Sequence, residues 1–436
     1  ILAFGNILIA SADILIVPAD TIRIFLNRYI PLFRAEKWDN FYLDLEERIL
    51  PTIVWPKRKV KTLSCFNCLC IFAFMKYSFI IPVYNRPDEV DELLASLCEQ
   101  TLKDFEVIVV EDGSTIPCHD VVENYAGRLD VHYFQKTNSG PGQTRNYGVE
   151  RAHGEYVLIL DSDVVLPVDY LSAVETELTQ HPCDAFGGPD RAHESFSPMQ
   201  KAINYAMTSF FTTGGIRGGK KKMDKFYPRS FNMGVRTDVY QKLEGFSKMR
   251  FGEDIDFSTR IFENGYKALL FPTAWVWHKR RTDLKKFFKQ VHNSGIARIN
   301  LTKRHPGTLK LVHLLPMVFT LGVGFLLLLV LVGLLLMASG ALVCHSTDCP
   351  VAASLNNCSF LGEHLVCFGL LPLILYSLII CVDSTLQNKS LGVGLRSIAA
   401  AFVQLTGYGS GFIRAWWQRC VLGRGEFEAF KKNFYK

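Results

Sequence analysis

An uncharged stretch from Leu314 to Val343 limits what this chain can fold into more than any other feature. It contains the continuous apolar run Phe325–Val332. About 20 consecutive apolar residues are enough for a helix to cross a bilayer, and a helix satisfies its own backbone there. The alternative is a helix buried in the core of a soluble domain. The length of the stretch favours a membrane-spanning helix.

Two more apolar stretches follow. Leu365–Val382 is uncharged and long enough to span a bilayer. Gly392–Trp417 is weaker, because it carries Arg396, Gln404 and Arg414. We therefore expect two spans and a third segment that is interfacial or re-entrant, at about residues 314–338, 365–382 and 392–417.

Basic residues are distributed unevenly around these stretches. Residues 344–364 contain no Lys or Arg, while basic residues precede the first span and return after the second: Lys303, Arg304, Lys310, Lys389, Arg419, Arg424, Lys431, Lys432 and Lys436. Cytoplasmic loops carry the excess of Lys and Arg. The chain is thus expected to be a multi-pass protein of the inner or plasma membrane, with residues 75–302 and its tail in the cytoplasm.

Four cysteines lie in or beside the loop between the two expected spans: Cys344, Cys349, Cys358 and Cys367. In this orientation the loop faces an oxidising compartment, where disulfides form. Their pairing stays open.

Strands and helices alternate between Tyr77 and about Thr302. Four short apolar runs rich in β-formers predict strands at Ser78–Val83, Phe105–Val110, Val131–Phe134 and Tyr156–Leu160. Helices are predicted between them, at Pro87–Gln100, near Asp120–Ala126 and at Gly142–Ala152. This alternation is typical of a mainly parallel, doubly wound α/β sheet.

Residues 1–74 lack this periodicity, and Met75 stands directly before the first predicted strand. We expect Met75 to be the functional start and residues 1–74 to be an extension of uncertain status; the alternative is a membrane-associated N-terminal segment. Cys65, Cys68 and Cys70 resemble a metal or redox motif, but no second pair follows at zinc-site spacing. The expected division is 1–74, then an α/β domain at 75–302, then a membrane region at 303–436.

Asp161-Ser162-Asp163 directly follows the strand Tyr156–Leu160. The carboxyl edge of an open α/β sheet is where such folds hold their ligands. Carboxylate oxygens suit Mg²⁺ or Mn²⁺, and a cation held by few carboxylates completes its shell with substrate phosphates. The pair therefore indicates chemistry on a diphosphate-activated substrate, although a solvated strand end would look the same if the pair stood alone.

Two other sites sit at predicted strand ends or helix starts. Asp112 lies in the acidic turn that follows the predicted strand Phe105–Val110, and it could accept hydrogen bonds from a nucleobase or ribose. A plain Asp-Gly turn is the alternative. The loop Asn138–Asn146 opens a helix, so its amides and Arg145 could meet phosphate or base. A helix cap alone would also explain that loop.

Acidic residues also open the predicted helix after Gly252. Glu253 and Asp254 are either caps favoured by the helix dipole or include a general base. His278 ends the run Trp275-Val276-Trp277 and is either a packed residue or a third metal ligand.

Taken together, these motifs resemble the family 2 glycosyltransferases of the GT-A fold over Tyr77–Arg281. The matching pieces stand in the family's order: Phe79–Asn85, Glu111–Ser114, Ala152–Tyr156 leading into Asp161–Asp163, Asn232–Arg236, Gly245-Phe246 and Gly252–Asp254. The resemblance implies an α/β, GT-A (nucleotide-diphospho-sugar transferase, Rossmann-like) domain, here followed by C-terminal transmembrane helices.

The resemblance also implies roles for single residues. The residues matching the nucleotide site are Pro82, Tyr84, Asp112 and Asp161, with Arg145 nearby. Asp161 and Asp163 match the metal-binding Asp-x-Asp, with Asp163 in direct contact, and His278 matches a histidine that joins the metal in some members. Asp254 matches the catalytic base, with Glu253 beside it.

The implied activity is inverting transfer from a nucleotide-sugar donor, with Mg²⁺ or Mn²⁺, to a hydroxyl of a saccharide or polyprenyl-linked acceptor at the lipid bilayer. The stretch Gln290–Gly295 lacks the Arg-Trp of processive synthases, which favours transfer of one sugar at a time. The alternative is a catalytically silent GT-A protein that only binds a nucleotide-sugar. A net charge of only +6 does not indicate a nucleic-acid partner.

Overall fold

The computed structural model describes residues 2–4, 7–9, 76–191, 196–213, 226–249, 251–343 and 352–426. Contacts divide the chain into the units Ile1–Phe74 and Met75–Lys436. In the first unit, β1 (Leu2–Phe4) and β2 (Ile7–Ile9) pair antiparallel. The Cys65, Cys68 and Cys70 motif lies outside the described residues.

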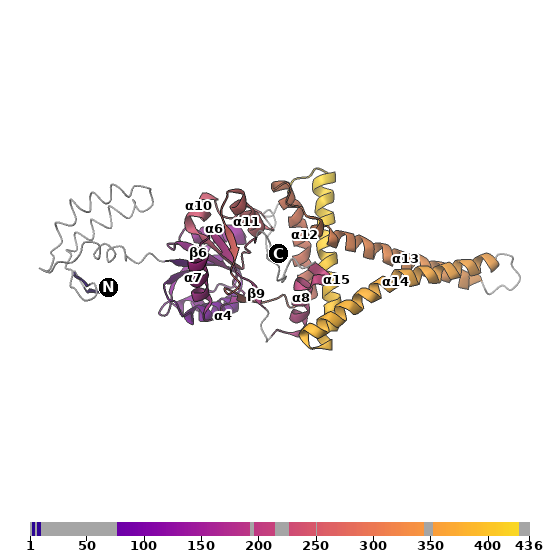
Figure 1. Cartoon of the computed structure of the whole chain (residues 1–436), viewed down its shortest axis with the longest axis horizontal. Coiled ribbons are helices and arrows are strands. Elements are labelled where there is room, and N and C mark those ends of the chain that lie inside the picture. Colours follow the sequence, from indigo (N-terminus) through magenta and orange to yellow (C-terminus); the bar gives the residue numbers. More distant parts are fainter. Residues whose placement is uncertain are drawn as a thin grey trace. The chain divides into compact units, whose positions relative to one another are not determined.

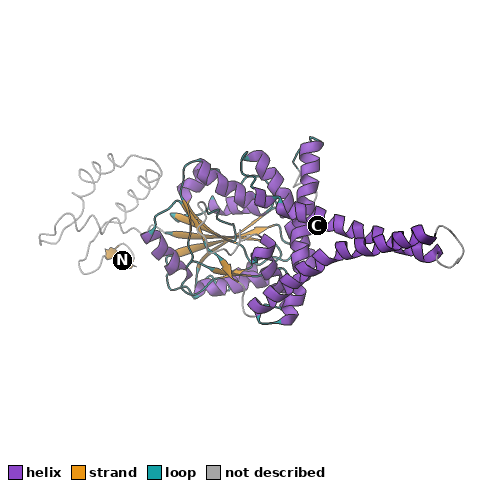
Figure 2. Ribbon diagram, turned by 45° about the vertical axis from the view of Figure 1, so that its right-hand side comes forward, coloured by secondary structure: helices purple, strands orange, loops and turns teal. Residues whose placement is uncertain are grey.

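The second unit is built on a seven-stranded sheet of order β11-β8-β10-β6-β3-β4-β5 (Figure 2). Its strands are β3 (Tyr77–Val83), β4 (Phe105–Asp112), β5 (Asp130–Lys136), β6 (Tyr156–Leu160), β8 (Ala185–Gly187), β10 (Asn232–Arg236) and β11 (Ala268–Leu270). Only β10 runs antiparallel to its neighbours within this sheet. The predicted mainly parallel α/β sheet is confirmed.

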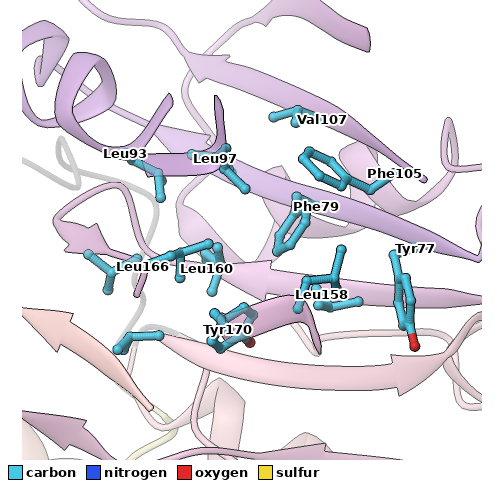
Figure 3. Close-up of a cluster of buried hydrophobic side chains, with 14 of the residues drawn as sticks. Tyr77, Phe79, Leu93, Leu97, Phe105, Val107, Leu158, Leu160, Leu166 and Tyr170 are labelled. Atoms are coloured by element: carbon cyan, nitrogen blue, oxygen red, sulfur yellow. The ribbon is translucent and has the colours of Figure 1, made fainter. Parts of the chain in front are cut away.

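Helices cover both faces of this sheet: α4 (Pro87–Cys98), α5 (His119–Glu123), α6 (Pro141–Val149), α7 (Tyr170–Gln180), α10 (Thr237–Lys242) and α11 (Glu253–Glu263). Successive residues of a strand point to opposite faces, so Phe79 packs on the α4 and α7 side and Ile80 on the other. Figure 3 shows Phe79 among Leu97, Leu160 and Tyr170. Burial on both faces explains why the central strand β6 is apolar throughout, whereas the edge strand β5 is partly exposed and carries polar residues.

A small second sheet stands beside the first, in the order β7-β12-β9. It consists of β7 (Val164–Val165), β9 (Asp190–Arg191) and β12 (Val276–His278). β12 pairs antiparallel with β7 and parallel with β9. This sheet brings three distant parts of the chain together next to the end of β6.

Two helices, α13 (Leu315–Val343) and α14 (Ala352–Asn388), form a hairpin. Among the described residues they are the two helices long and apolar enough to cross a membrane, over Leu311–Ser339 and Ser359–Asn388. Only 6% and 17% of their most apolar windows are buried, unlike the core helix of a soluble protein. Cys344 and Cys349 of the connecting loop lie outside the described residues.

α15 (Leu391–Trp416) is the expected third segment and does not qualify as a span. It packs against α12 (Leu284–Arg304), α8 (Pro198–Thr208) and both helices of the hairpin. Figure 1 shows α15 running across the base of that hairpin. Short elements complete this region: α9 (Phe210–Thr213), the 3₁₀ turn η4 (Leu311–His313) and the π-helical turn η5 (Trp417–Val421).

Glycines let α12 and α15 approach closely. A Cβ built on Gly411 would lie 2.0 Å from the carbonyl oxygen of His292, and one on Gly295 would lie 2.1 Å from that of Tyr408. Because backbone atoms cannot move aside as a flexible side chain can, neither position has room for a methyl group.

Replacing Gly411 by alanine is therefore expected to destabilise the protein by about 1–3 kcal/mol through overpacking. Gly322→Ala on α13 is the control, since nothing lies within 4 Å of its Cβ position. Thermal unfolding of the full chain in detergent should show a lower midpoint for Gly411→Ala only. Equal midpoints would mean that α12 and α15 are not in close contact.

Candidate active site

Three predicted metal ligands meet at the carboxyl end of β6. Asp161 and Asp163 follow this strand, and pairing of His278 with Val164 brings the histidine beside them. One ligand atom from each of the three side chains lies within 4.8 Å of the others. Two carboxylates and an imidazole are a suitable donor set for a divalent cation such as Mn²⁺, so the residues present fit the expected metal.

Asp163 lies between two cationic partners. His278 Nε2 is 3.3 Å from Asp163 Oδ1, and Arg86 Nη1 is 3.0 Å from Oδ2. Burial opposes ionisation of Asp163, but the hydrogen bond from His278 and the charges of His278 and Arg86 hold its pKa below the ordinary range. Burial likewise favours neutral His278, yet its carboxylate neighbours raise its pKa to about 9. A bound cation needs the neutral imidazole, so it would displace this proton.

Arg145 connects the two acidic motifs. From α6 it donates from Nη2 to Asp161 Oδ1 over 2.7 Å and from Nη1 to Glu253 Oε1 over 3.1 Å. Burial alone would lower the pKa of its guanidinium, but the two carboxylates raise it above the usual value. Burial raises the pKa of Glu253, against the effect of Arg145. The sequence indicated that Arg145 could meet phosphate or base. In the structure it contacts Asp161 of the Asp-x-Asp pair and Glu253 at the start of α11.

Asp254 lies at the start of α11, as predicted. Gly252 precedes the helix with φ 83°, a left-handed conformation that suits glycine. Asp254 Oδ2 accepts from Arg229 Nε over 2.7 Å, and Oδ1 accepts from the Ile255 amide over 2.9 Å. The carboxylate is thus held in one orientation at the edge that also carries Glu253.

The expected nucleotide residues lie at the ends of β3 and β4. Pro82 pairs with Val110, and Tyr84 follows β3 directly. Asp112 is buried and accepts from Lys136 Nζ over 2.6 Å and from the amides of Ser139 and Gly140 over 2.9 Å. In this structure Asp112 therefore holds the loop that opens α6 in place.

Several residues at this edge were not predicted. They are Arg86, which pairs with Asp163; Arg229, which pairs with Asp254; Phe231, stacked on His278 with ring centroids 4.9 Å apart; and the ion pair of Asp190 with the buried Arg280. Arg86 and Arg280 are close in sequence to Tyr84 and His278, which is the one signal that could have found them.

Part of the sheet domain is similar to known proteins. Residues 78–243 match the family model for Glycosyl transferase family 2. Poly(ribitol-phosphate) beta-N-acetylglucosaminyltransferase TarS of Staphylococcus aureus is 40% identical over 114 residues, covering 25% of this chain and 20% of TarS. The uncharacterized glycosyltransferase EpsJ of Bacillus subtilis is 32% identical over 200 residues, covering 44% of this chain and 57% of EpsJ.

Among solved structures, the mannosyltransferase PcManGT from Pyrobaculum calidifontis, in complex with GDP-Man and Mn²⁺, aligns with a TM-score of 0.45 at 15% identity. The alignment covers 79% of this chain and 88% of PcManGT. Of the two relatives compared by sequence, the chain spans a fifth of the length of TarS and little more than half that of EpsJ.

Proposed function

Because residues 78–243 match the family model for Glycosyl transferase family 2, we propose that the chain transfers a sugar from a nucleotide-diphospho-sugar to an acceptor hydroxyl. The observation that supports this most is the gathering of Asp161, Asp163 and His278 within 4.8 Å. Glu253 and the proposed catalytic base Asp254 together form what we call the base motif. Arg145 connects Glu253 of this motif to Asp161 of the cluster.

The donor would lie across the ends of β3, β4 and β6. Its base and ribose would meet Pro82, Tyr84 and Asp112. Asp161, Asp163 and His278 would hold one divalent cation, Mg²⁺ or Mn²⁺, which neutralises charge on the departing nucleoside diphosphate. Arg145 acts here by orienting Asp161.

The reaction would be a single displacement with inversion. Asp254 takes the proton from the acceptor hydroxyl, whose oxygen bonds to the anomeric carbon while the bond from that carbon to the diphosphate breaks. Arg229 keeps the Asp254 carboxylate oriented for this step. Glu253 stays on Arg145 and keeps the start of α11 in place.

The acceptor is proposed to reach the site from a bilayer crossed by α13 and α14, as a saccharide or polyprenyl-linked molecule, with the catalytic domain in the cytoplasm. A Cβ on Gly252, next to the base motif, would lie 3.2 Å from Ala297 Cβ on α12. α12 in turn packs on α15. The base motif therefore lies against α12, which packs on α15 at the base of the hairpin. This position favours an acceptor that reaches the site from the membrane.

The test is release of nucleoside diphosphate by the full chain in detergent, with a panel of nucleotide-sugars, a lipid extract as acceptor, and either Mn²⁺ or EDTA. We expect release from one donor with Mn²⁺, and loss of release with EDTA. Sealed vesicles of both orientations, given the same donor from outside, should react only when the cytoplasmic face is outward.

Release that continues in EDTA would contradict the metal proposal, and release from both vesicle orientations would contradict the topology. Binding of a donor without any release, with acceptor lipid present, would favour the catalytically silent alternative.

A further inference from the structure

Asp190 and Arg280 form an ion pair beside the candidate metal site, and the proposed reaction gives them no role. Arg280 Nη1 lies 2.5 Å from Asp190 Oδ2, and the arginine side chain is buried. Building on the proposed metal site, we propose that Asp190 is the carboxylate that orients His278 for the cation, and that Arg280 and α8 hold Asp190 in place.

The two ring nitrogens of His278 face different partners. Nε2 points to Asp163, while Nδ1 is buried, has no hydrogen bond among the described residues, and lies 3.6 Å from Asp190 Oδ2. Metal-bound histidines almost always donate the other ring N–H to a carboxylate, a carbonyl or water. Asp190 occupies that position, and a small shift would bring it within hydrogen-bond reach.

Local structure limits where both side chains can go. β12 pairs in parallel with β9, which sets Asp190 opposite Val276, two residues before His278. Phe231 stacks on the imidazole with an angle of 27° between the rings. The ring is thus held from its face, and its rotation depends on what its nitrogens bond.

Arg280 ties Asp190 to α8. Its Nε and Nη2 each donate to Asn204 Oδ1 over 3.0 Å, and its carbonyl accepts from Gln200 Nε2 over 3.1 Å. Asn204 therefore holds the guanidinium of Arg280, and Gln200 holds its backbone carbonyl. An arginine bound in this way presents its remaining N–H groups in one fixed direction.

α8 is itself fixed on the hairpin. Tyr205, the next residue after Asn204, donates its hydroxyl to Asp383 of α14 over 2.5 Å and packs with Ile380 and Ala401. A continuous series of contacts thus runs from α14 through α8, Arg280 and Asp190 to the candidate metal ligand. On this basis the helices of the hairpin contribute to the geometry of the metal site.

The test is the Mn²⁺ dissociation constant of the full chain in detergent, measured by electron paramagnetic resonance. Asp190→Asn keeps the side-chain shape and removes the charge, and we expect Mn²⁺ binding to weaken by about 10–100-fold. Asp184→Asn is the matched control, because Asp184 is similarly exposed (22% against 25%) and pairs with Arg236 over 3.2 Å. Its dissociation constant should equal that of the unchanged protein.

A second variant is needed because Asp190→Asn removes the negative charge beside the buried Arg280 and could weaken Mn²⁺ binding by destabilising the fold. Asn204→Ala keeps both Asp190 and His278 and removes the two hydrogen bonds from the Arg280 side chain to α8, while the bond from Gln200 remains. We expect a smaller loss of Mn²⁺ affinity than for Asp190→Asn, together with a weaker spin-echo modulation from the bound imidazole nitrogen. A residue that only stabilised the fold would not change that modulation.

His278→Ala separates the two proposals. If it weakens Mn²⁺ binding while Asp190→Asn and Asn204→Ala bind as the unchanged protein does, the metal site stands and the role of Asp190 is wrong. If His278→Ala also binds Mn²⁺ normally, His278 is no ligand, and both the third metal ligand and this inference are overturned.

Discussion

Replacing Asp254 by asparagine is expected to slow sugar transfer by about 10²–10⁴-fold while the donor still binds. Asparagine keeps the shape of the side chain, and its single oxygen can still accept from either Arg229 Nε or the Ile255 amide, which bond separate oxygens of the carboxylate. It cannot take the proton from the acceptor hydroxyl. The defect should therefore appear in single-turnover transfer rates, with the donor dissociation constant measured by calorimetry unchanged.

Asp256→Asn is the control for this prediction, two residues further along the same helix. Asp256 is bound by Ser247 Oγ at 2.8 Å, His305 Nε2 at 3.0 Å and Arg260 Nε at 3.1 Å, away from the sheet edge. Its loss should lower the unfolding temperature and leave the transfer rate of the folded fraction intact. Full turnover by Asp254→Asn would remove the base assignment.

The repeating elements of this chain were predictable because each rests on local information. The strand Tyr156–Leu160 was predicted with its observed bounds, since a short apolar run ends in acidic residues there. The helix predicted at Pro87–Gln100 ends at Cys98. The antiparallel β10 could not be predicted, because the direction of a strand depends on where a long connection returns it.

The second apolar helix shows what hydropathy can and cannot predict. The expected span was 365–382, whereas α14 runs from Ala352 to Asn388. Uncharged residues indicate the part that lipid can surround. Just beyond this part on either side, Gly362 lies against Gly333 of α13 and Asp383 accepts from Tyr205 of α8, contacts that residue charge alone does not indicate.

Contacts between distant residues limited the prediction of the site. Asp161, Asp163 and His278 were predicted from their motifs, and the structure brings the three side chains together. Their role as metal ligands stays a prediction. Asp190 carries no motif, and it becomes relevant only because β9 pairs with β12. Arg145 was noted for its place in a loop, but its two carboxylate partners lie 16 and 108 residues away.

Replacing Arg145 by methionine is expected to destabilise the protein by about 1–3 kcal/mol, because it leaves two partly buried carboxylates without their cation. The Arg145 side chain is 4% exposed, and its partners Asp161 and Glu253 lie on different elements. Methionine fills similar space, so the loss reports mainly on the charge. The midpoint of thermal unfolding of the full chain should fall accordingly.

Arg236→Met is the matched control. Arg236 also bonds two carboxylates, Asp184 at 3.2 Å and Asp238 at 2.8 Å, but its side chain is 40% exposed. Exposed ion pairs contribute about 0–1 kcal/mol, so this variant should unfold close to the temperature of the unchanged protein. Equal midpoints for the two variants would show that the Arg145 contacts do not stabilise the fold.

Two further variants locate the origin of the loss. Arg145→Lys keeps the charge but lacks the fork that reaches both carboxylates, so its stability should be intermediate. Glu253→Gln in the Arg145→Met background removes one of the stranded charges and should recover part of the lost stability. If it recovers none, the two side chains do not interact, and Arg145 does not join the metal-binding turn to the base motif.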